Sequence, residues 1–413
     1  MGEKIYGLLG RKLGHSWSVP IHRDLGCEDY RLIELEPDQL GDFLSREDIG
    51  GLNVTIPYKR EVMKYCDAID EGAKAIGSVN TLVRREGKLY GYNTDIDGFL
   101  YMLRRAKISL TGKKVLVLGS GGASLTAQAA AKREGAREIV VVSRSGSENY
   151  DNLTERHGDA EAVINTTPVG MWPNMDGSPL DLTCLPELEA VADVIYNPSR
   201  TSLLLQAEYC GMNRSGGLPM LVAQAVRAEE LFFDKTVPEA VTERIVSQLR
   251  QDRTNIVLVG MPGCGKTTVG MELARLSGKP FVDLDEKIVD SAGTSIPEIF
   301  RQEGEETFRH LESLVLNDVC AQGGQVIATG GGAVLQKENR TAMRRTGRVY
   351  FLRRDLSLLP KEGRPLSQKG SLEEMYRVRR PLYQAAADVV LDNSISVREA
   401  AELIWKNFCE NEP

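Results

Sequence analysis

The 413-residue sequence has no apolar run long enough to span a bilayer, so we expect no membrane segment. It also opens without a basic leader and a small-residue cleavage site, which predicts a cytoplasmic protein. The seven cysteines form no Cys-x-x-Cys pair, and the four histidines are isolated. We therefore expect neither a disulfide framework nor a zinc site.

Positive charge is also in short supply, because 51 lysines and arginines face 58 acidic residues and leave a net charge of -7. Proteins that bind nucleic acids usually neutralise phosphates with a basic surface. We therefore expect small-molecule substrates as partners, and neither nucleic acid nor a membrane. The composition leaves open whether the chain is a monomer or a homo-oligomer.

Two glycine-rich loops, within residues 113–135 and 254–278, each follow an apolar β-branched run and precede a helical pattern. Strand and helix signals alternate after both loops, which predicts an α/β fold with parallel sheets. Before the first loop, strand signals occur at 5–10, 30–35, 50–57 and 81–93. We predict an α/β substrate domain over 1–107, to which helices within 221–250 return, a Rossmann domain over 108–220, and a P-loop domain over 254–413. A helix over 238–250 and the linker Gln-Asp-Arg-Thr at 251–254 should join the last two domains.

The first loop, Gly-Ser-Gly-Gly-Ala-Ser, has glycines that permit a tight turn and a close approach to a pyrophosphate at a helix N-terminus. The next strand ends at Arg144 without an acidic residue that could hold a ribose diol. An arginine there suits the 2′-phosphate of NADP(H). We assign the cofactor contacts to Gly119, Gly121, Gly122, Ala123, Ser143, Arg144 and Ser145.

The second loop, Gly-Met-Pro-Gly-Cys-Gly-Lys-Thr, fits the P-loop pattern G-x-x-x-x-G-K-[ST] in full. Its backbone amides should surround the phosphates of ATP, Lys266 should reach the β- and γ-phosphates, and Thr267 should ligate Mg²⁺. We assign the nucleotide contacts to Gly260, Gly263, Cys264, Gly265, Lys266, Thr267 and Thr268. The loop alone does not distinguish a kinase from a motor, a GTPase or a regulatory ATPase.

Seven ordered motifs over about 1–250 resemble the shikimate dehydrogenase family: KLGHSWSVPIH, GLNVTIPYK, AIGSVNTLV, GYNTDIDGF, INTTPVGMWP, YNPSRTSLL and GLPMLVAQA. The resemblance implies NADPH-dependent reduction of 3-dehydroshikimate to shikimate. It implies that Lys59 is the general acid/base and that Asp95 is its partner at the reacting oxygen. It places substrate contacts at Ser16, Ser18, Asn53, Thr55, Asn80 and Gln224, and Tyr196 and Gly217 near the nicotinamide. His15 and His22 are expected to be structural.

Five further motifs over about 254–413 resemble the shikimate kinase family: VDLDEKI, FRQEGEETFRHLE, VIATGGGAVL, GRPLS and RRPLYQAAADVVLD. The resemblance implies a nucleoside monophosphate kinase-like fold and ATP-dependent phosphorylation of shikimate. It implies that Arg309 and Arg379 bind the substrate carboxylate, that Gly331 lies against the ring, and that Arg364 is the lid arginine. We expect Asp283, at a strand end, to hold Mg²⁺ through water, and Asp285, on the same side of the strand, to accept the hydroxyl proton.

The two implied reactions are consecutive, so their fusion in one chain makes chemical sense. Two alternatives stay open at this point. The first half could act on quinate or use NAD, although Arg144 favours NADP. The kinase half could be an inactive or regulatory module, although Lys266 and Asp285 are both present.

Overall fold

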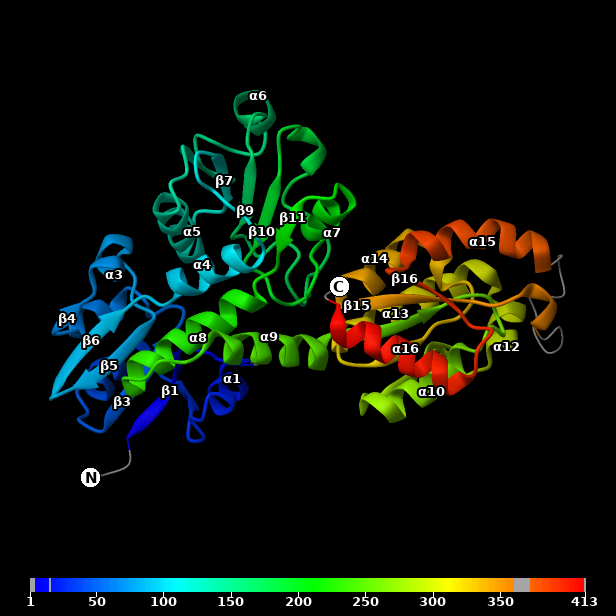
Figure 1. The fold of residues 1–413 in the computed structure, drawn as a ribbon, viewed down its shortest axis with the longest axis horizontal. Coiled ribbons are helices and arrows are strands. Elements are labelled where there is room, and N and C mark those ends of the chain that lie inside the picture. The colour runs from blue at the N-terminus through cyan, green and yellow to red at the C-terminus, as the bar shows by residue number, and fades with distance from the viewer. Residues whose placement is uncertain (1–3, 15, 360–371, 412–413) are drawn as a thin grey trace. The chain divides into compact units, whose positions relative to one another are not determined.

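The structure is a computed structural model that describes residues 4–14, 16–359 and 372–411 (Figure 1). The chain divides into two compact units. Unit 1 comprises Met1–Gly170, Gly177–Tyr196 and Gln206–Gln248, and unit 2 comprises Met171–Asp176, Asn197–Leu205 and Leu249–Pro413. The described residues form three sheets.

The first sheet of unit 1 is mixed and has the strand order β2-β1-β3-β5-β6-β4. Its strands are β1 (Ile5–Gly10), β2 (Arg31–Glu34), β3 (Ile49–Val54), β4 (Ala68–Ile69), β5 (Thr81–Arg85) and β6 (Lys88–Tyr92). The strand signal at 81–93 is in fact an antiparallel hairpin of β5 and β6. It turns at Glu86 and Gly87, both with positive φ. Positive φ at two successive positions is what a tight two-residue hairpin loop requires.

The helices around this sheet are α1 (Ser18–Asp24), α2 (Leu40–Leu44), α3 (Glu71–Ile76), α4 (Asp95–Arg105) and α8 (Leu218–Phe233). Helices α4 and α8 pack along each other (Figure 1). They meet closely at Gly98, where a Cβ would lie 2.5 Å from the carbonyl oxygen of Met220. The helix that returns from the C-terminal end of unit 1 therefore lies beside the start of α4.

The second sheet of unit 1 is parallel throughout, as expected, with the order β11-β10-β9-β7-β8. Its strands are β7 (Lys114–Leu118), β8 (Glu138–Val142), β9 (Ala162–Asn165), β10 (Ala190–Asp193) and β11 (Asn213–Ser215). Its helices are α5 (Gly122–Arg133), α6 (Leu153–His157) and α7 (Ser202–Tyr209). Strands β7, β9 and β10 are buried along their full length. That burial explains their continuous apolar runs, because both faces of a parallel sheet are covered.

The sheet of unit 2 is also parallel, with the order β13-β14-β12-β15-β16. Its strands are β12 (Asn255–Val259), β13 (Phe281–Asp283), β14 (Val326–Ala328), β15 (Gly347–Arg353) and β16 (Val389–Asp392). Its helices are α10 (Lys266–Ser277), α11 (Leu284–Ala292), α12 (Ile296–Gln302), α13 (Gly304–Gln322), α14 (Lys337–Thr346), α15 (Leu372–Ala386) and α16 (Val397–Glu410). The core forms where β12 and β15 meet these helices.

The expected linker at 251–254 is wrong, because helix α9 (Glu239–Arg253) runs through most of it. Gln251, Asp252 and Arg253 contain neither glycine nor proline, and the backbone N–H of Thr254 still donates to the carbonyl of Arg250. Only Thr254 separates the helix from β12.

Short 3-10 helices lie at η1 (Pro37–Gln39), η2 (Glu61–Tyr65), η3 (Leu182–Cys184), η4 (Ala333–Leu335) and η5 (Leu356–Leu358). Among the described residues, no helix is both long enough and apolar enough to cross a membrane.

Two candidate active sites

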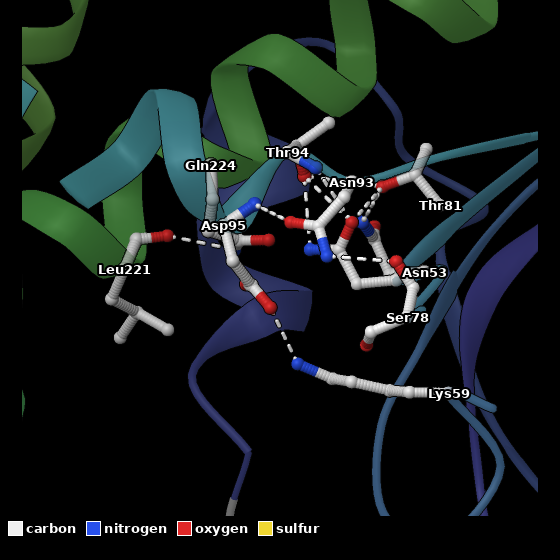
Figure 2. A network of polar contacts seen from close by, with 10 residues as sticks. Asn53, Lys59, Ser78, Thr81, Asn93, Thr94, Asp95, Leu221 and Gln224 are labelled. Carbon is white, nitrogen blue, oxygen red and sulfur yellow. Dashed lines mark hydrogen bonds and ion pairs between the residues drawn. The ribbon is translucent and has the colours of Figure 1, made fainter. Parts of the chain in front are cut away.

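In unit 1, Lys59 and Asp95, the two residues predicted to act on the reacting oxygen, form an ion pair (Figure 2). Lys59 follows β3 in the chain, and Asp95 is the first residue of α4. The Nζ atom lies 2.6 Å from Oδ2, and the two side chains are 30% and 15% exposed. The pair is therefore sheltered by the protein but still open to a small molecule.

Asp95 owes its place to the helix that it begins. Its backbone N–H donates to the side-chain oxygen of Asn93 at 3.1 Å. Its carboxylate lies in the first turn of α4, where the helix dipole favours negative charge. Gln224 of α8 reaches the same helix, because its Cβ lies 3.0 Å from where a Cβ on Gly98 would stand. Its side-chain amide donates to the carbonyl of Leu221 at 2.8 Å (Figure 2).

A buried network of amides and hydroxyls lies close to this pair (Figure 2). The Oδ1 atom of Asn80 accepts from the backbone N–H of Thr94 at 2.7 Å. Its Nδ2 atom donates to the hydroxyl of Thr94 at 3.1 Å. The hydroxyl of Thr81 lies 3.1 Å from that of Thr94 and accepts from Nδ2 of Asn53 at 3.4 Å. Asn53 and Asn80, both predicted substrate contacts, therefore belong to one network that joins β3, β5 and the start of α4.

The other predicted substrate residues of unit 1 lie on neighbouring segments. Ser18, in the first turn of α1, donates its backbone N–H to the hydroxyl of Ser16 at 3.2 Å. Thr55 directly follows β3, and its N–H donates to the carbonyl of Leu9. Ser16 and Ser18 thus bond to each other, whereas Asn53 and Asn80 share a network. His15 lies outside the described residues.

The predicted dinucleotide loop connects β7 to α5. Gly119 has a φ of +105°, and a Cβ there would lie 2.8 Å from the hydroxyl of Thr166. Gly121 caps α5, and the space beside it and Gly122 is open. Ala123 lies in the first turn of the helix. The loop therefore leaves room for a phosphate group at the helix N-terminus.

Arg144 lies just beyond the end of β8 and is exposed, with Ser143 half-buried and Ser145 exposed beside it. Burial raises the pKa of the neighbouring Tyr150, and the positive charge of Arg144 works against that increase. The guanidinium is therefore available to an anionic ligand at the strand end.

The two residues predicted near the nicotinamide lie after β10. The ring of Tyr196 packs against Trp17, with the ring centroids 4.9 Å apart, and burial raises the pKa of its hydroxyl. Gly217 precedes α8, and a Cβ there would lie only 2.0 Å from the carbonyl oxygen of Val194. Only a glycine fits that position without a backbone shift.

In unit 2, the P-loop connects β12 to α10, as predicted. Gly260, Gly263 and Gly265 all have positive φ, which glycine adopts at little cost. The Nζ atom of Lys266 donates to the carbonyls of Gly260 at 2.9 Å and Met261 at 3.1 Å. The lysine therefore folds back over its own loop.

Cys264 contributes to this loop through its backbone, because its side chain is fully buried in the core. Its carbonyl oxygen accepts from the side chain of Asn393 at 2.6 Å. Thr267 and Thr268 lie in the first turn of α10, and both line the cavity described below.

Asp283 and Thr267, the predicted magnesium ligands, lie together. The hydroxyl of Thr267 donates to Oδ2 of Asp283 at 2.8 Å. Asp283 ends β13 and caps α11, because its Oδ1 accepts from the backbone N–H of Asp285 at 3.0 Å. The expectation that Asp285 shares a side of the strand is therefore wrong: β13 ends at Asp283, and Asp285 lies in the first turn of α11. Strand alternation does not apply there, because the carboxylate of Asp283 starts a helix.

Both predicted carboxylate-binding arginines are held against the glycine-rich segment that follows β14. Arg309 of α13 pairs with Glu312 at 2.7 Å and with Glu305 at 3.2 Å. A Cβ on Gly332 would lie 2.3 Å from a guanidinium nitrogen of Arg309. Arg379 of α15 donates to the carbonyl of Gly331 at 3.0 Å.

A cavity of about 520 Å³ brings these groups together. The predicted residues that line it are Gly263, Gly265, Lys266, Thr267, Thr268, Asp283, Asp285, Arg309, Gly331 and Arg379. Its volume is typical of a pocket for a small molecule. Arg364, the predicted lid arginine, lies outside the described residues.

Sequence reasoning missed three polar residues of these sites. Thr81 and Thr94 each follow an asparagine, in the two Asn-Thr pairs of VNTLV and YNTDI, and that repeated pair was a usable signal. Glu312 lies three residues after Arg309, a spacing that places both on one face of a helix. Burial raises the pKa of Glu312, although the charge of Arg309 opposes this shift.

Comparison with known proteins supports both halves. The family model described as shikimate dehydrogenase substrate binding domain matches residues 8–82, and the one described as shikimate kinase matches 262–408. The chain is 37% identical to a shikimate dehydrogenase (NADP(+)) of Clostridium perfringens over 268 residues, which are 60% of this chain and 98% of that protein.

Solved structures agree with this similarity. A chorismate mutase/shikimate 5-dehydrogenase fusion protein from Clostridium acetobutylicum aligns with a TM-score of 0.58 and 36% identity, covering 61% of this chain and 98% of that one. A quinate dehydrogenase from Corynebacterium glutamicum in complex with NAD aligns with a TM-score of 0.55 and 27% identity, covering 59% and 99%. A shikimate kinase domain follows the dehydrogenase part in the same chain. The chain therefore belongs to the shikimate dehydrogenase family and is a bifunctional enzyme of the shikimate pathway.

Proposed function

We propose that the chain reduces 3-dehydroshikimate to shikimate with NADPH and then phosphorylates shikimate to shikimate 3-phosphate with ATP. The observation that carries this proposal is that one chain holds two complete sets of reactive groups. Lys59 and Asp95 lie 2.6 Å apart in unit 1, and Lys266 and Asp285 line one cavity in unit 2. We propose a division into a substrate domain at 1–107 with helices from 221–250, a Rossmann domain at 108–220, and a kinase domain at 254–413.

In the first reaction, Lys59 donates a proton to the ketone oxygen as the carbonyl carbon accepts a hydride. Bound NADPH supplies that hydride. Asp95 orients the ammonium group through the 2.6 Å ion pair. Asn53, Asn80, Ser16, Ser18, Thr55 and Gln224 supply donors and acceptors for the carboxylate and hydroxyls of the substrate.

The cofactor preference of the first reaction is proposed from Arg144 together with the open loop that precedes α5. The segment from Gly119 to Ala123 holds the pyrophosphate at the helix N-terminus. The exposed guanidinium of Arg144 pairs with the 2′-phosphate that distinguishes NADP from NAD. The relative from C. perfringens carries NADP(+) in its name, whereas the quinate dehydrogenase structure holds NAD.

In the second reaction, Asp285 accepts the proton of the substrate hydroxyl, and Lys266 stabilises negative charge on the transferring phosphoryl group. Arg309 and Arg379 bind the substrate carboxylate, since a guanidinium presents paired donors to that group. The hydroxyl of Thr267 and the carboxylate of Asp283 offer the hard oxygen ligands that Mg²⁺ prefers, so these residues fit a magnesium ion. Arg364 is proposed as the lid residue over ATP.

The experiment uses the purified full-length chain. Shikimate with NADP⁺ should produce NADPH absorbance, and shikimate with Mg-ATP should produce a phosphorylated product detected by mass spectrometry. Lys59→Ala should abolish the first signal alone, and Lys266→Ala the second alone. Quinate with NAD⁺ serves as the competing substrate pair. Faster turnover of quinate than of shikimate, or no phosphorylated product, would contradict the respective half of the proposal.

A further inference from the structure

A buried cluster in unit 1 contains ionisable groups that the proposed reaction does not use. We call it the His22 cluster and define it as the buried residues His22, Tyr30 and Glu229, which the exposed Lys235 contacts from the surface. The side chains of His22 and Glu229 are 1% and 0% exposed. Burying ionisable groups costs free energy of folding, so we expect this cluster to have a role in the substrate site.

Glu229 contacts both the imidazole ring of His22 and the ammonium group of Lys235. Nδ1 of His22 lies 2.7 Å from Oε1 of Glu229, and the second oxygen of Glu229 accepts from Nζ of Lys235 at 3.2 Å. Burial lowers the pKa of His22, although the facing groups Glu229 and Asn53 work to raise it. The ring is therefore neutral near pH 7, and Nδ1 donates its hydrogen to the carboxylate. His22 is in α1 and Glu229 is in α8, so this bond ties those two helices together.

Tyr30 connects the imidazole to the substrate network. Its ring stacks on that of His22 with the centroids 3.8 Å apart and the planes 6° from parallel. Its hydroxyl donates to Oδ1 of Asn53 at 2.8 Å. Burial raises the pKa of Tyr30 well above its usual value, so the hydroxyl remains a hydrogen-bond donor throughout the working range of pH.

This bond engages the oxygen end of the Asn53 amide. Because Oδ1 is engaged by Tyr30, the NH₂ group is directed toward the hydroxyl of Thr81, at 3.4 Å. An asparagine amide without such a partner could flip and present its oxygen instead. The bond to Thr81 is long, which leaves the NH₂ group able to donate to an oxygen of a ligand.

We propose that Tyr30 is a positioning residue that presents the Asn53 amide to the substrate as a hydrogen-bond donor, and that His22 and Glu229 hold Tyr30 for this task. The group recognised is then an acceptor oxygen of a polyhydroxylated carboxylic acid. This inference rests on the proposed function of Asn53 as a substrate contact.

The test is the substitution Tyr30→Phe in the full-length chain, because it keeps the stacked ring and removes only the hydroxyl. Loss of one positioned donor should raise KM for shikimate about 5- to 30-fold, in line with a hydrogen bond worth roughly 1–2 kcal/mol. We expect kcat to change less than about twofold, because the Lys59–Asp95 pair is untouched, and KM for NADP⁺ to stay constant. Tyr6→Phe is the matched control, since Tyr6 packs on Phe232 in the same core.

A double-mutant cycle separates positioning from packing. If Tyr30 acts through Asn53, Tyr30→Phe should raise KM less than about twofold in an Asn53→Ala background. An equal rise in both backgrounds would overturn the proposal, as would an unchanged KM in the single variant. His22→Gln is a second variant in case Tyr30→Phe does not fold. The glutamine can still bond to Glu229, but it cannot stack on the ring of Tyr30. The KM increase that His22→Gln causes should disappear in the Asn53→Ala background. Wild-type chain that fails to oxidise shikimate would instead refute the proposed function before any variant is compared.

Discussion

The site of unit 1 is built from side chains that hydrogen-bond one another, whereas the site of unit 2 is built around the backbone of glycine-rich segments. In unit 1, Asn80 and Thr94 bond across separate segments, and Lys59 pairs with Asp95. In unit 2, Lys266 donates to loop carbonyls, and Arg379 donates to the carbonyl of Gly331. Side-chain donors and acceptors suit the first site to hydrogen-bonding a small polyol, whereas backbone amides suit the second site to binding phosphates.

This difference indicates which substitutions harm each site. The first site should be sensitive to loss of a single donor or acceptor, because its members satisfy one another. The second site should be sensitive to a methyl group added at one of its glycines, because neighbouring side chains already fill the space beside Gly331 and Gly332. Each activity also serves as an internal control for substitutions in the other unit.

Asp285→Asn should cause the largest effect, because it removes the proposed proton acceptor while keeping the shape of the side chain. The kinase rate should fall about 10²- to 10⁴-fold, the usual contribution of general base catalysis. Initial rates with saturating shikimate and ATP measure it, and the dehydrogenase rate of the same sample is the control. A kinase rate within a factor of three of wild type would remove Asp285 from the mechanism.

Gly332→Ala should raise the KM of the kinase for shikimate about 10- to 100-fold. Its φ of -104° and ψ of -6° suit alanine, so the backbone is not strained. The new Cβ would stand 2.3 Å from the guanidinium of Arg309, which must move away from the substrate. Displacing a charge-assisted contact costs roughly 1.5–3 kcal/mol, which corresponds to that change. An unchanged KM would mean that Arg309 does not bind shikimate.

Arg144→Ala should lower the preference of the dehydrogenase for NADP⁺ over NAD⁺ by about 10- to 100-fold, because a hydrogen bond to a charged phosphate is worth roughly 1.5–3 kcal/mol. The ratio of kcat/KM for the two cofactors measures it. Lys132→Ala, an exposed cation at the end of α5, is the control and should leave the ratio unchanged. An unaltered ratio in Arg144→Ala would assign the preference to another residue.

Mild acid should destabilise unit 1 through His22, and this is the smallest expected effect. The pKa of His22 in the folded chain is lower than its usual value of 6.5, chiefly because of burial. As the pH falls below 6.5, the unfolded state binds a proton that the folded state does not, so the free energy of unfolding decreases, by at most about 1.4 kcal/mol per pH unit. Hydrogen exchange in peptides of α1 and α8 measures the decrease, and peptides of α13, with the exposed His310, serve as the control. The same slope in His22→Gln would contradict this account.

Much of the fold could be predicted from local pattern. Both glycine-rich loops lie between a strand and a helix as expected, because their apolar runs, glycines and helical periodicity all agree. Two local expectations failed. Asp283 ends a strand and starts a helix, which moved Asp285 off the strand. The polar run at 251–253 continued α9 because no residue in it stops a helix.

The candidate sites were predictable to the extent that motifs carried them. Lys59 and Asp95 were paired from motif resemblance, and their 2.6 Å distance agrees with that pairing. The bond from Tyr30 to Asn53 spans 23 residues, and Tyr30 lies in none of the motifs, so only the folded chain reveals it. The contact between Arg309 and Gly332 joins two separate motifs and is also visible only in the folded chain, because it depends on how α13 packs against the segment after β14.

The most direct test of two complete active sites in one chain is a coupled conversion by the purified protein. The chain is given 3-dehydroshikimate, NADPH, ATP and Mg²⁺, and the product is quantified by mass spectrometry. We expect shikimate 3-phosphate from the wild-type chain. Lys59→Ala should give no product from 3-dehydroshikimate but normal product from added shikimate, and Lys266→Ala should accumulate shikimate. Consumption of NADPH without any phosphorylated product in the wild-type chain would contradict this expectation.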